Sequence, residues 1–256
     1  MPDSDALSPS ATAVRARLAA ALDGLTGPPP APLPPLDPLP VMTLARGRVH
    51  ELTGAARHVL AAALTGRAQP EGPVLWLRPT RGERLCPQGL LRFADPGALI
   101  AVVCRHPADM LWAAEEALQS GAVALVVAEL ATAPDLRQIR RLHRAAAEGV
   151  ARAGAGSSGG SGGGSGGQRR APLGALMMQE QSESRIAGVE SRWALDPLPP
   201  APDGPAWLLA RLRARDAPPA DWPLDPGPRG LAMRRHHAPA RLLDAPLPAG
   251  AAASPP

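Results

Sequence analysis

The middle of the chain alternates between short apolar runs and longer segments whose apolar residues recur every three or four positions. The apolar runs have the length of β-strands and lie at residues 49–52, 74–77, 98–104 and 122–130. The segments with helical spacing lie at 55–67, 83–93, 107–120 and 135–149. Because unbroken apolar strands between helices must be covered on both faces, the pattern predicts an α/β fold with a mostly parallel sheet flanked by helices.

Local signals mark the ends of two of these helices. Segment 107–120 opens with Pro107 and stops before Gly121, where proline suits the first turn and glycine the C-terminal cap. Segment 135–149 has Asp135 as a predicted N-cap and Gly149 as a predicted end. Further along, three more strands are predicted, and the last two are compatible with a terminal hairpin: 173–179, 186–195 and 206–215.

Proline, glycine and serine divide the chain into three regions. Residues 1–45 hold a small amphipathic helix at 9–25, tethered by a Pro-rich linker that runs to about residue 40. Residues 46–216 form the predicted core, interrupted at 156–167 by a Gly/Ser segment with a root-mean-square reach of about 20 Å. That segment is either an engineered connector or a natural low-complexity insert. Residues 217–256 are predicted to be a disordered, basic, Pro/Ala-rich C-terminal tail.

The composition restricts the function classes only moderately. The 256 residues include 33 Pro, 26 Gly, no Tyr and one Phe, so the five Trp must supply most of the aromatic packing. A net charge of +4 permits contact with nucleic acid without requiring it. Cys86 and Cys104 are predicted to be buried free thiols of a reducing cytoplasm. The N-terminus has no apolar signal region and no apolar run has the length of a membrane span, so a cytoplasmic protein is expected.

Residues 47–54, Gly-Arg-Val-His-Glu-Leu-Thr-Gly, have the pattern of a strand and turn that lead into a phosphate-binding loop. Such a loop needs Gly-Lys-Ser/Thr, because backbone N–H groups and a Lys hold the phosphates and a hydroxyl binds Mg²⁺. This chain continues with Ala-Ala-Arg-His-Val-Leu, and all 27 of its basic Lys/Arg residues are Arg. Arg does not routinely replace the loop Lys. The sequence therefore favours a scaffold or regulator over an enzyme.

Over roughly residues 46–195 the order of elements resembles the RecA ATPase core, and within it the ImuA family of RecA-like accessory proteins of bacterial damage-induced mutagenesis. Residues 47–54 are similar to the strand before the RecA phosphate loop. Residues 107–130, which include Trp-Ala-Ala-Glu-Glu-Ala-Leu-Gln-Ser-Gly-Ala-Val, are similar to the helix and the Walker B strand. Residues 190–193, Glu-Ser-Arg-Trp, are similar to a late strand of ImuA sequences. The resemblance implies a RecA-like fold.

The chain departs from the RecA pattern at the catalytic positions. Residues 77–80, Leu-Arg-Pro-Thr, stand where the resemblance implies a catalytic Glu, and the two DNA-binding loops are absent. A degenerate nucleotide site would lie around Gly54, Arg57 and Glu129, with Gln179 or Gln181 as the nucleotide-sensing residue. Glu129 is more simply interpreted as a surface residue at a strand end, and the six His lack metal-ligand spacing. No catalytic residue, cofactor or metal is predicted.

Arg residues and one Trp are the candidates for contact with partners or nucleic acid. Arg137, Arg141 and Arg144 line a predicted helix, either as a solvated face or as a weak phosphate-contacting stripe. The C-terminal region is more basic, and there the alternatives are partner or DNA contact and a solubilising tail: Arg229, Arg234, Arg235 and Arg241. Trp222 lies among prolines, where a core is not expected, and is predicted to be a partner anchor.

The expected function is that of a non-catalytic accessory protein for SOS-induced translesion DNA synthesis and mutagenesis. The resemblance implies as partners an ImuB-type polymerase-like protein, an error-prone DNA polymerase and, as a further candidate, RecA. DNA contact is expected to be weak or indirect, with the protein at the nucleoid after damage and at no membrane. Two alternatives stay open: a weak ATPase with Arg57 in place of Lys, and a non-specific single-stranded DNA-binding protein.

Overall fold

The computed structural model describes residues 33–81, 84–155, 171–178, 186–200, 206–227 and 230–234. The chain divides into two units at residue 33, and the description that follows concerns the second unit, residues 34–256. Several predicted features lie outside the described residues: the helix at 9–25, the Gly/Ser segment, Gln179, Gln181, Arg229, Arg235 and Arg241. Among the described helices, none is both long and apolar enough to cross a membrane.

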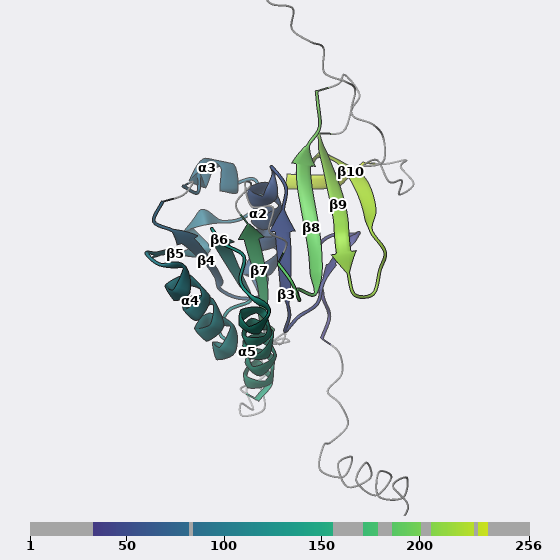
Figure 1. Cartoon of the computed structure of the whole chain (residues 1–256). Helices are drawn as coiled ribbons and strands as arrows, with labels where there is room; N and C mark the ends of the chain where they lie inside the picture. Colours follow the sequence, from purple (N-terminus) through teal and green to yellow (C-terminus); the bar gives the residue numbers. More distant parts are fainter. Residues whose placement is uncertain are drawn as a thin grey trace, which may run out of the picture. The chain divides into compact units, whose positions relative to one another are not determined.

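One sheet of nine strands organises the described part of this unit (Figure 1). Its strands are β3 (Val49–Thr53), β4 (Val74–Pro79), β5 (Leu99–Cys104), β6 (Leu125–Leu130), β7 (Leu173–Met178), β8 (Ser191–Pro197), β9 (Trp207–Ala214), β10 (Ala220–Gly227) and β11 (Gly230–Met233). They lie in the order β11-β10-β9-β8-β3-β7-β6-β4-β5. The strands from β8 to β5 are parallel, whereas β9, β10 and β11 continue the sheet antiparallel. The predicted α/β fold with a mostly parallel sheet is confirmed, and so is the β8–β9 hairpin.

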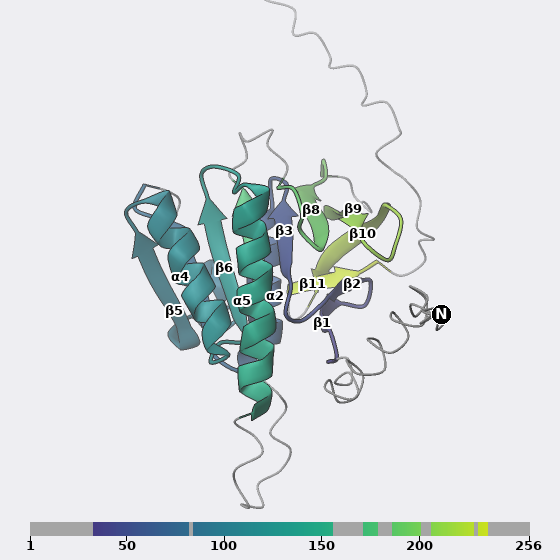
Figure 2. The ribbon, with the colours of Figure 1, turned by 60° about the horizontal axis from the view of Figure 1, so that its bottom comes forward.

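Helices cover both faces of the parallel strands. Figure 2 shows α4 (Pro107–Ser120) and α5 (Leu136–Ala155) across one face and α2 (Arg57–Ala68) on the other. Successive strand residues point to opposite faces, so the sheet supports two cores. Leu60 and Leu64 of α2 pack into the first core, and Met110 and Ile139 of α4 and α5 into the second. A short helix, α3 (Pro87–Leu90), and two 3-10 turns, Gln69–Glu71 and Pro96–Ala98, complete the helical elements described.

The local signals predict both ends of α4 correctly and the end of α5 wrongly. Gly121 caps α4 in the left-handed region with φ 69°. Asp135 Oδ1 accepts from the Gln138 N–H at 2.8 Å and Gln138 Oε1 accepts from the Asp135 N–H at 2.8 Å, which is a capping box at the start of α5. The predicted end at Gly149 is wrong, because α5 continues to Ala155. A Cβ at residue 149 would lie 1.9 Å from the Leu118 carbonyl oxygen, so this glycine allows α4 and α5 to approach closely.

Two apolar elements are less buried than the sequence predicts. β5 is an edge strand that pairs only with β4 among the described strands, and its Ile100 and Val103 side chains are 49% and 48% exposed. The helix predicted at 83–93 is reduced to α3. Cys86, just before α3, is exposed, so its predicted burial is wrong, whereas Cys104 is buried as predicted.

The core extends further along the chain than 46–216. Residues assigned to the linker form a hairpin of β1 (Leu36–Leu39) and β2 (Met42–Leu44), and residues assigned to the disordered tail form β10 and β11. Both predictions are wrong at these residues. The physical reason is that apolar side chains from both segments join the core on the α2 side of the sheet: Leu36, Met42, Leu44, Trp222 and Leu224. Trp222 and Leu224, on either side of Pro223 in β10, bury large apolar side chains in this core.

The helix contact at Gly149 leads to a stability prediction. Gly149→Ala is expected to lower the free energy of unfolding by about 1–3 kcal/mol, because the added methyl group meets backbone that cannot move away. Gly154→Ala in the same helix is the matched control, since a Cβ there meets no atom within 4 Å. The control is expected to be neutral or to stabilise by up to about 1 kcal/mol. Denaturant unfolding of both variants checks this, and equal effects would contradict it.

Candidate functional site

The candidate site is the turn between β3 and α2. Gly54 has φ 89°, and a Cβ at this residue would lie 2.4 Å from the Leu195 carbonyl oxygen. Glycine is therefore required both for the backbone conformation and for the close approach of β8. The turn brings the start of α2 directly against the end of β8.

The N–H groups of this turn already have acceptors from the protein itself. The Ala55 N–H donates to Asp196 Oδ1 at 2.7 Å, and the Ala56 N–H donates to the Leu195 carbonyl oxygen at 2.8 Å. Free N–H groups and the helix dipole make a helix N-terminus a binding place for phosphate or another anion. In this structure the Asp196 carboxylate accepts from the Ala55 N–H, just before the N-cap residue Ala56 of α2.

Arg57, the residue proposed as a substitute for the missing Lys, belongs to the same turn. Its Nη1 donates to the Gly54 carbonyl oxygen at 3.3 Å, and its backbone N–H donates to the same oxygen at 3.2 Å. The side chain is buried. The guanidinium therefore braces the turn.

Glu129 at the end of β6 is buried, with 7% of its surface exposed, so its interpretation as a surface residue is wrong. Trp76 Nε1 donates to Glu129 Oε1 at 2.6 Å, and His58 Nε2 lies 3.7 Å from the same oxygen. β6 has strands on both sides and α2 above it, which explains why a residue at its end is covered. The structure thus brings Gly54, Arg57 and Glu129 together around the start of α2.

Three polar pairs between β3 and β8 set the position of Asp196. Residues 48, 50 and 51 contact residues 190, 191 and 192 respectively. Arg48 Nε lies 3.6 Å from Glu190 Oε2, His50 Nδ1 lies 2.7 Å from Ser191 Oγ, and Arg192 Nε donates to Glu51 Oε2 at 2.5 Å. The first three residues of the Glu-Ser-Arg-Trp motif, 190–192, therefore hold β8 beside β3.

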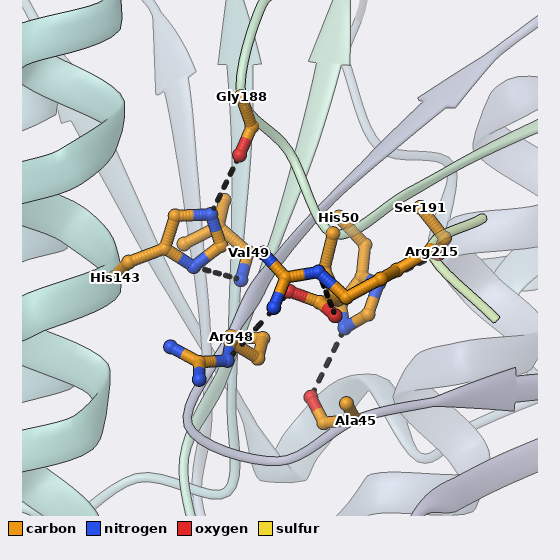
Figure 3. A network of polar contacts seen from close by, with 9 residues as sticks. Ala45, Arg48, Val49, His50, His143, Gly188, Ser191 and Arg215 are labelled. Carbon is orange, nitrogen blue, oxygen red and sulfur yellow. Dashed lines mark hydrogen bonds and ion pairs between the residues drawn. The ribbon is translucent and has the colours of Figure 1, made fainter. Parts of the chain in front are cut away.

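The middle pair belongs to a buried chain of hydrogen bonds with one consistent set of protons. The Ala45 carbonyl oxygen can only accept, so His50 Nε2 donates to it at 3.0 Å, and Nδ1 of the neutral ring accepts from the Ser191 hydroxyl (Figure 3). Trp193 Nε1 donates to Ser191 Oγ at 2.9 Å. Burial away from water lowers the pKa of His50 to about 4, against the raising effect of the Ala45 carbonyl. His50 is therefore neutral in the folded protein at neutral pH.

His143 of α5 joins β3 to the segment before β8. Its Nδ1 accepts from the Val49 N–H at 3.2 Å, so its Nε2 donates to the Gly188 carbonyl oxygen at 3.0 Å (Figure 3). Burial lowers the pKa of His143, and the nearby Arg48 charge lowers it further. Both histidines thus act as neutral connectors next to the β3–β8 pair.

The described Arg residues among those predicted to contact partners or DNA lie on α5 and directly after β11. Arg141 pairs with Glu115 at 2.5 Å and Arg144 with Glu148 at 2.8 Å, while Arg137 is exposed. Arg234 lies 3.7 Å from Asp225 at the end of the sheet. The helix stripe is therefore partly neutralised by acidic side chains of α4 and α5.

Trp222 does not have the exposure that its predicted anchor role assumes. Its side chain is 7% exposed and stacks on Trp193 with ring centroids 6.0 Å apart. The Arg211 guanidinium lies over both rings, 5.7 Å from the Trp193 ring and 5.1 Å from the Trp222 ring. The reason for proposing Trp222 as a partner anchor is therefore wrong, because the tryptophan is part of the core.

Asp196 is the residue that the sequence interpretation missed. One signal for it exists: an acid directly follows the apolar residues 193–195 at the carboxyl end of a predicted strand. The carboxyl ends of parallel strands meet at one edge of a sheet, so this acid was placed to reach the Gly54 turn.

No protein-family model matches the sequence, and no curated protein matches it. Among solved structures, the fold is similar to the crystal structure of the RadB recombinase, with 13% sequence identity and a TM-score of 0.47. The match covers 74% of this chain and 91% of that chain. A similarity at this level assigns neither an activity nor a partner to the chain.

The role of Asp196 is tested by its removal. Asp196→Ala is expected to lower the free energy of unfolding by about 1 kcal/mol, because the exposed Ala55 N–H loses a charged acceptor. Asp196→Asn keeps an oxygen acceptor, so a smaller decrease in the free energy of unfolding is expected. Asp216→Ala, at an exposed acid, is the control and is expected to stay within about 0.5 kcal/mol of wild type. Denaturant unfolding measures all three, and an unchanged Asp196→Ala protein would contradict the bond.

The buried His50 leads to a pH prediction. In the unfolded chain His50 takes up a proton below about pH 6.5, whereas the folded protein resists it down to about pH 4. The contribution of His50 to the free energy of unfolding is therefore fully present above pH 6.5. It is lost as the pH falls toward 4, by up to about 3 kcal/mol. His50→Gln is expected to remove that share of the pH dependence, whatever its effect at pH 7. Unfolding at pH 7 and pH 4.5 measures it, and identical slopes for both proteins would refute the assignment.

Proposed function

We propose that this chain is a non-catalytic, RecA-like accessory protein that assembles with error-prone polymerase components for translesion DNA synthesis after damage. The observation that carries the proposal is the occupied turn before α2, where Asp196 accepts from the Ala55 N–H and Leu195 accepts from the Ala56 N–H. The particular damage-response role comes from the sequence resemblance to the ImuA family.

The chemistry of phosphoryl transfer supports a non-catalytic role. Such enzymes position the phosphates with loop N–H groups and a Lys, and they hold Mg²⁺ with a hydroxyl and an acid. Here the two N–H groups are bonded internally, the chain has no Lys, and Glu129 accepts from Trp76. The alternative of a weak ATPase requires that Asp196 leaves the turn and that Arg57 turns away from the Gly54 carbonyl.

Exposed apolar side chains support binding to other proteins. Ile100 and Val103 lie on the edge strand β5, whose outer backbone groups have no described strand beside them, and Trp112 of α4 is 62% exposed. Edge strands of this kind can pair with a strand of another chain, and an exposed Trp is a frequent anchor in interfaces. Arg141 and Arg144 are paired with Glu115 and Glu148, which reduces the positive charge that they offer to DNA. We therefore expect any DNA contact to be weak or indirect.

The proposal implies a complex with an ImuB-type polymerase-like protein and, through it, an error-prone polymerase, with RecA as a further candidate partner. Coexpression with the ImuB-type protein is expected to yield a stoichiometric complex in size-exclusion chromatography that persists after nuclease treatment and without ATP. Ile100→Asp/Val103→Asp is expected to weaken the complex at least tenfold, because it places charges on the exposed edge, whereas Asp216→Ala leaves it unchanged. A wild-type chain that elutes alone, or only with DNA, would contradict the proposal.

A further inference from the structure

A cavity of about 670 Å³ lies at the carboxyl ends of β4, β5 and β6, beside the starts of α4 and α5. In open parallel sheets, ligands bind in crevices at the carboxyl ends of the strands, and this volume is within the usual range of binding sites. None of residues 54–57 lines the cavity, but Glu129 belongs both to its wall and to the residues around the start of α2, so the cavity adjoins the Gly54 turn. The apolar floor and the basic rim of the cavity are formed by other residues.

The floor of this cavity is apolar and its rim is basic. Met110, Leu111 and Leu130 contribute aliphatic surface, and no Trp or Phe lines the cavity. Arg81, Arg105 and His106 lie at the exposed rim. Neither Arg forms an ion pair with another residue in the described part of the chain. Among the described residues that line the cavity, Glu129 is the one carboxylate, and it already accepts from Trp76. The cavity thus suits a ligand with an apolar group next to a negative charge.

The cavity continues as a groove between α4 and α5. A smaller hollow of about 140 Å³ shares Ala108, Leu111 and Gln138 with the cavity and extends past Trp112. Trp112 is 62% exposed, and the Arg141–Glu115 pair lies at the same hollow. An elongated occupant can therefore place one group in the cavity and another beside the exposed tryptophan.

We propose that the cavity and groove bind a segment of a partner protein in which an apolar side chain lies next to one or more carboxylates. The inference rests on the proposed function, because its occupant is a polypeptide partner. Charge complementarity supports this occupant, since the rim presents Arg81 and Arg105 to solvent. Single-stranded nucleic acid is less well matched, because its bases bind by stacking on aromatic side chains and the cavity lining has no Trp or Phe.

The first test does not depend on any particular partner. Ten-residue random peptides displayed on phage are selected against the full chain and counter-selected against Ala131→Trp, which places a large side chain at an exposed position of the cavity wall. The enriched peptides are expected to contain Leu or Phe next to Asp or Glu. Their affinity is expected to fall at least tenfold in Arg81→Glu/Arg105→Glu and less than twofold in Arg92→Glu/Arg213→Glu, a charge reversal of equal size at exposed residues outside the cavity lining. No enrichment, enrichment of basic peptides, or equal losses in all variants would overturn the inference.

The second test separates this inference from the proposed function. The ImuB-type protein is titrated against wild type, Ala131→Trp and the double Arg variant, and a labelled 20-nucleotide oligothymidine is titrated in parallel. At least tenfold weaker binding of the partner by both variants is the expected result. A partner that binds wild type and both variants equally would sink the inference and leave the proposed function standing. Oligothymidine binding that both variants abolish would assign the cavity to nucleic acid and overturn the inference.

Discussion

The pairing of β8 with β3 is the constraint on which the rest of this structure depends. Glu51 is in register with Arg192, and the two charged side chains meet in the interior at 2.5 Å. A buried charge that loses its partner costs about 3–5 kcal/mol, and a shift by one residue would turn each side chain to the other face. The ion pair, together with the His50–Ser191 hydrogen bond, therefore specifies the register. That register delivers Leu195 and Asp196 to the turn before α2.

The carboxyl edge of the sheet is consequently divided into two parts with different properties. At β3 and β8 the edge is closed, because the N–H groups of the turn are bonded to Leu195 and Asp196. At β4, β5 and β6 the edge is hollow and bordered by Arg side chains. The Asp196 carboxylate places a negative charge next to the N-terminus of α2, where the helix dipole favours it. Under the proposed function, partner contact is expected at the hollow part and at the neighbouring exposed strand β5.

The sequence predicts those features whose causes are local. The ends of α4 follow from Pro107 and Gly121, and the start of α5 follows from Asp135, because each signal acts within one helical turn. Features with distant causes are missed: Asp196 bonds to a residue 141 positions earlier in the chain. Trp222 likewise enters the core only because β10 lies beside β9 and its ring meets Trp193. The burial of a residue depends on its neighbours in space. The proline content of the surrounding sequence does not reveal those neighbours.

The most direct test of the closed turn is titration of the wild-type chain with ATP and Mg²⁺, followed by both calorimetry and the melting temperature. A ligand that binds the folded state must raise the melting temperature by mass action. The account predicts no binding heat and no shift at millimolar nucleotide, because Asp196 and Leu195 hold the N–H groups that phosphate requires. A saturable heat with a matching rise in melting temperature would show that the turn accepts phosphate and would contradict the account.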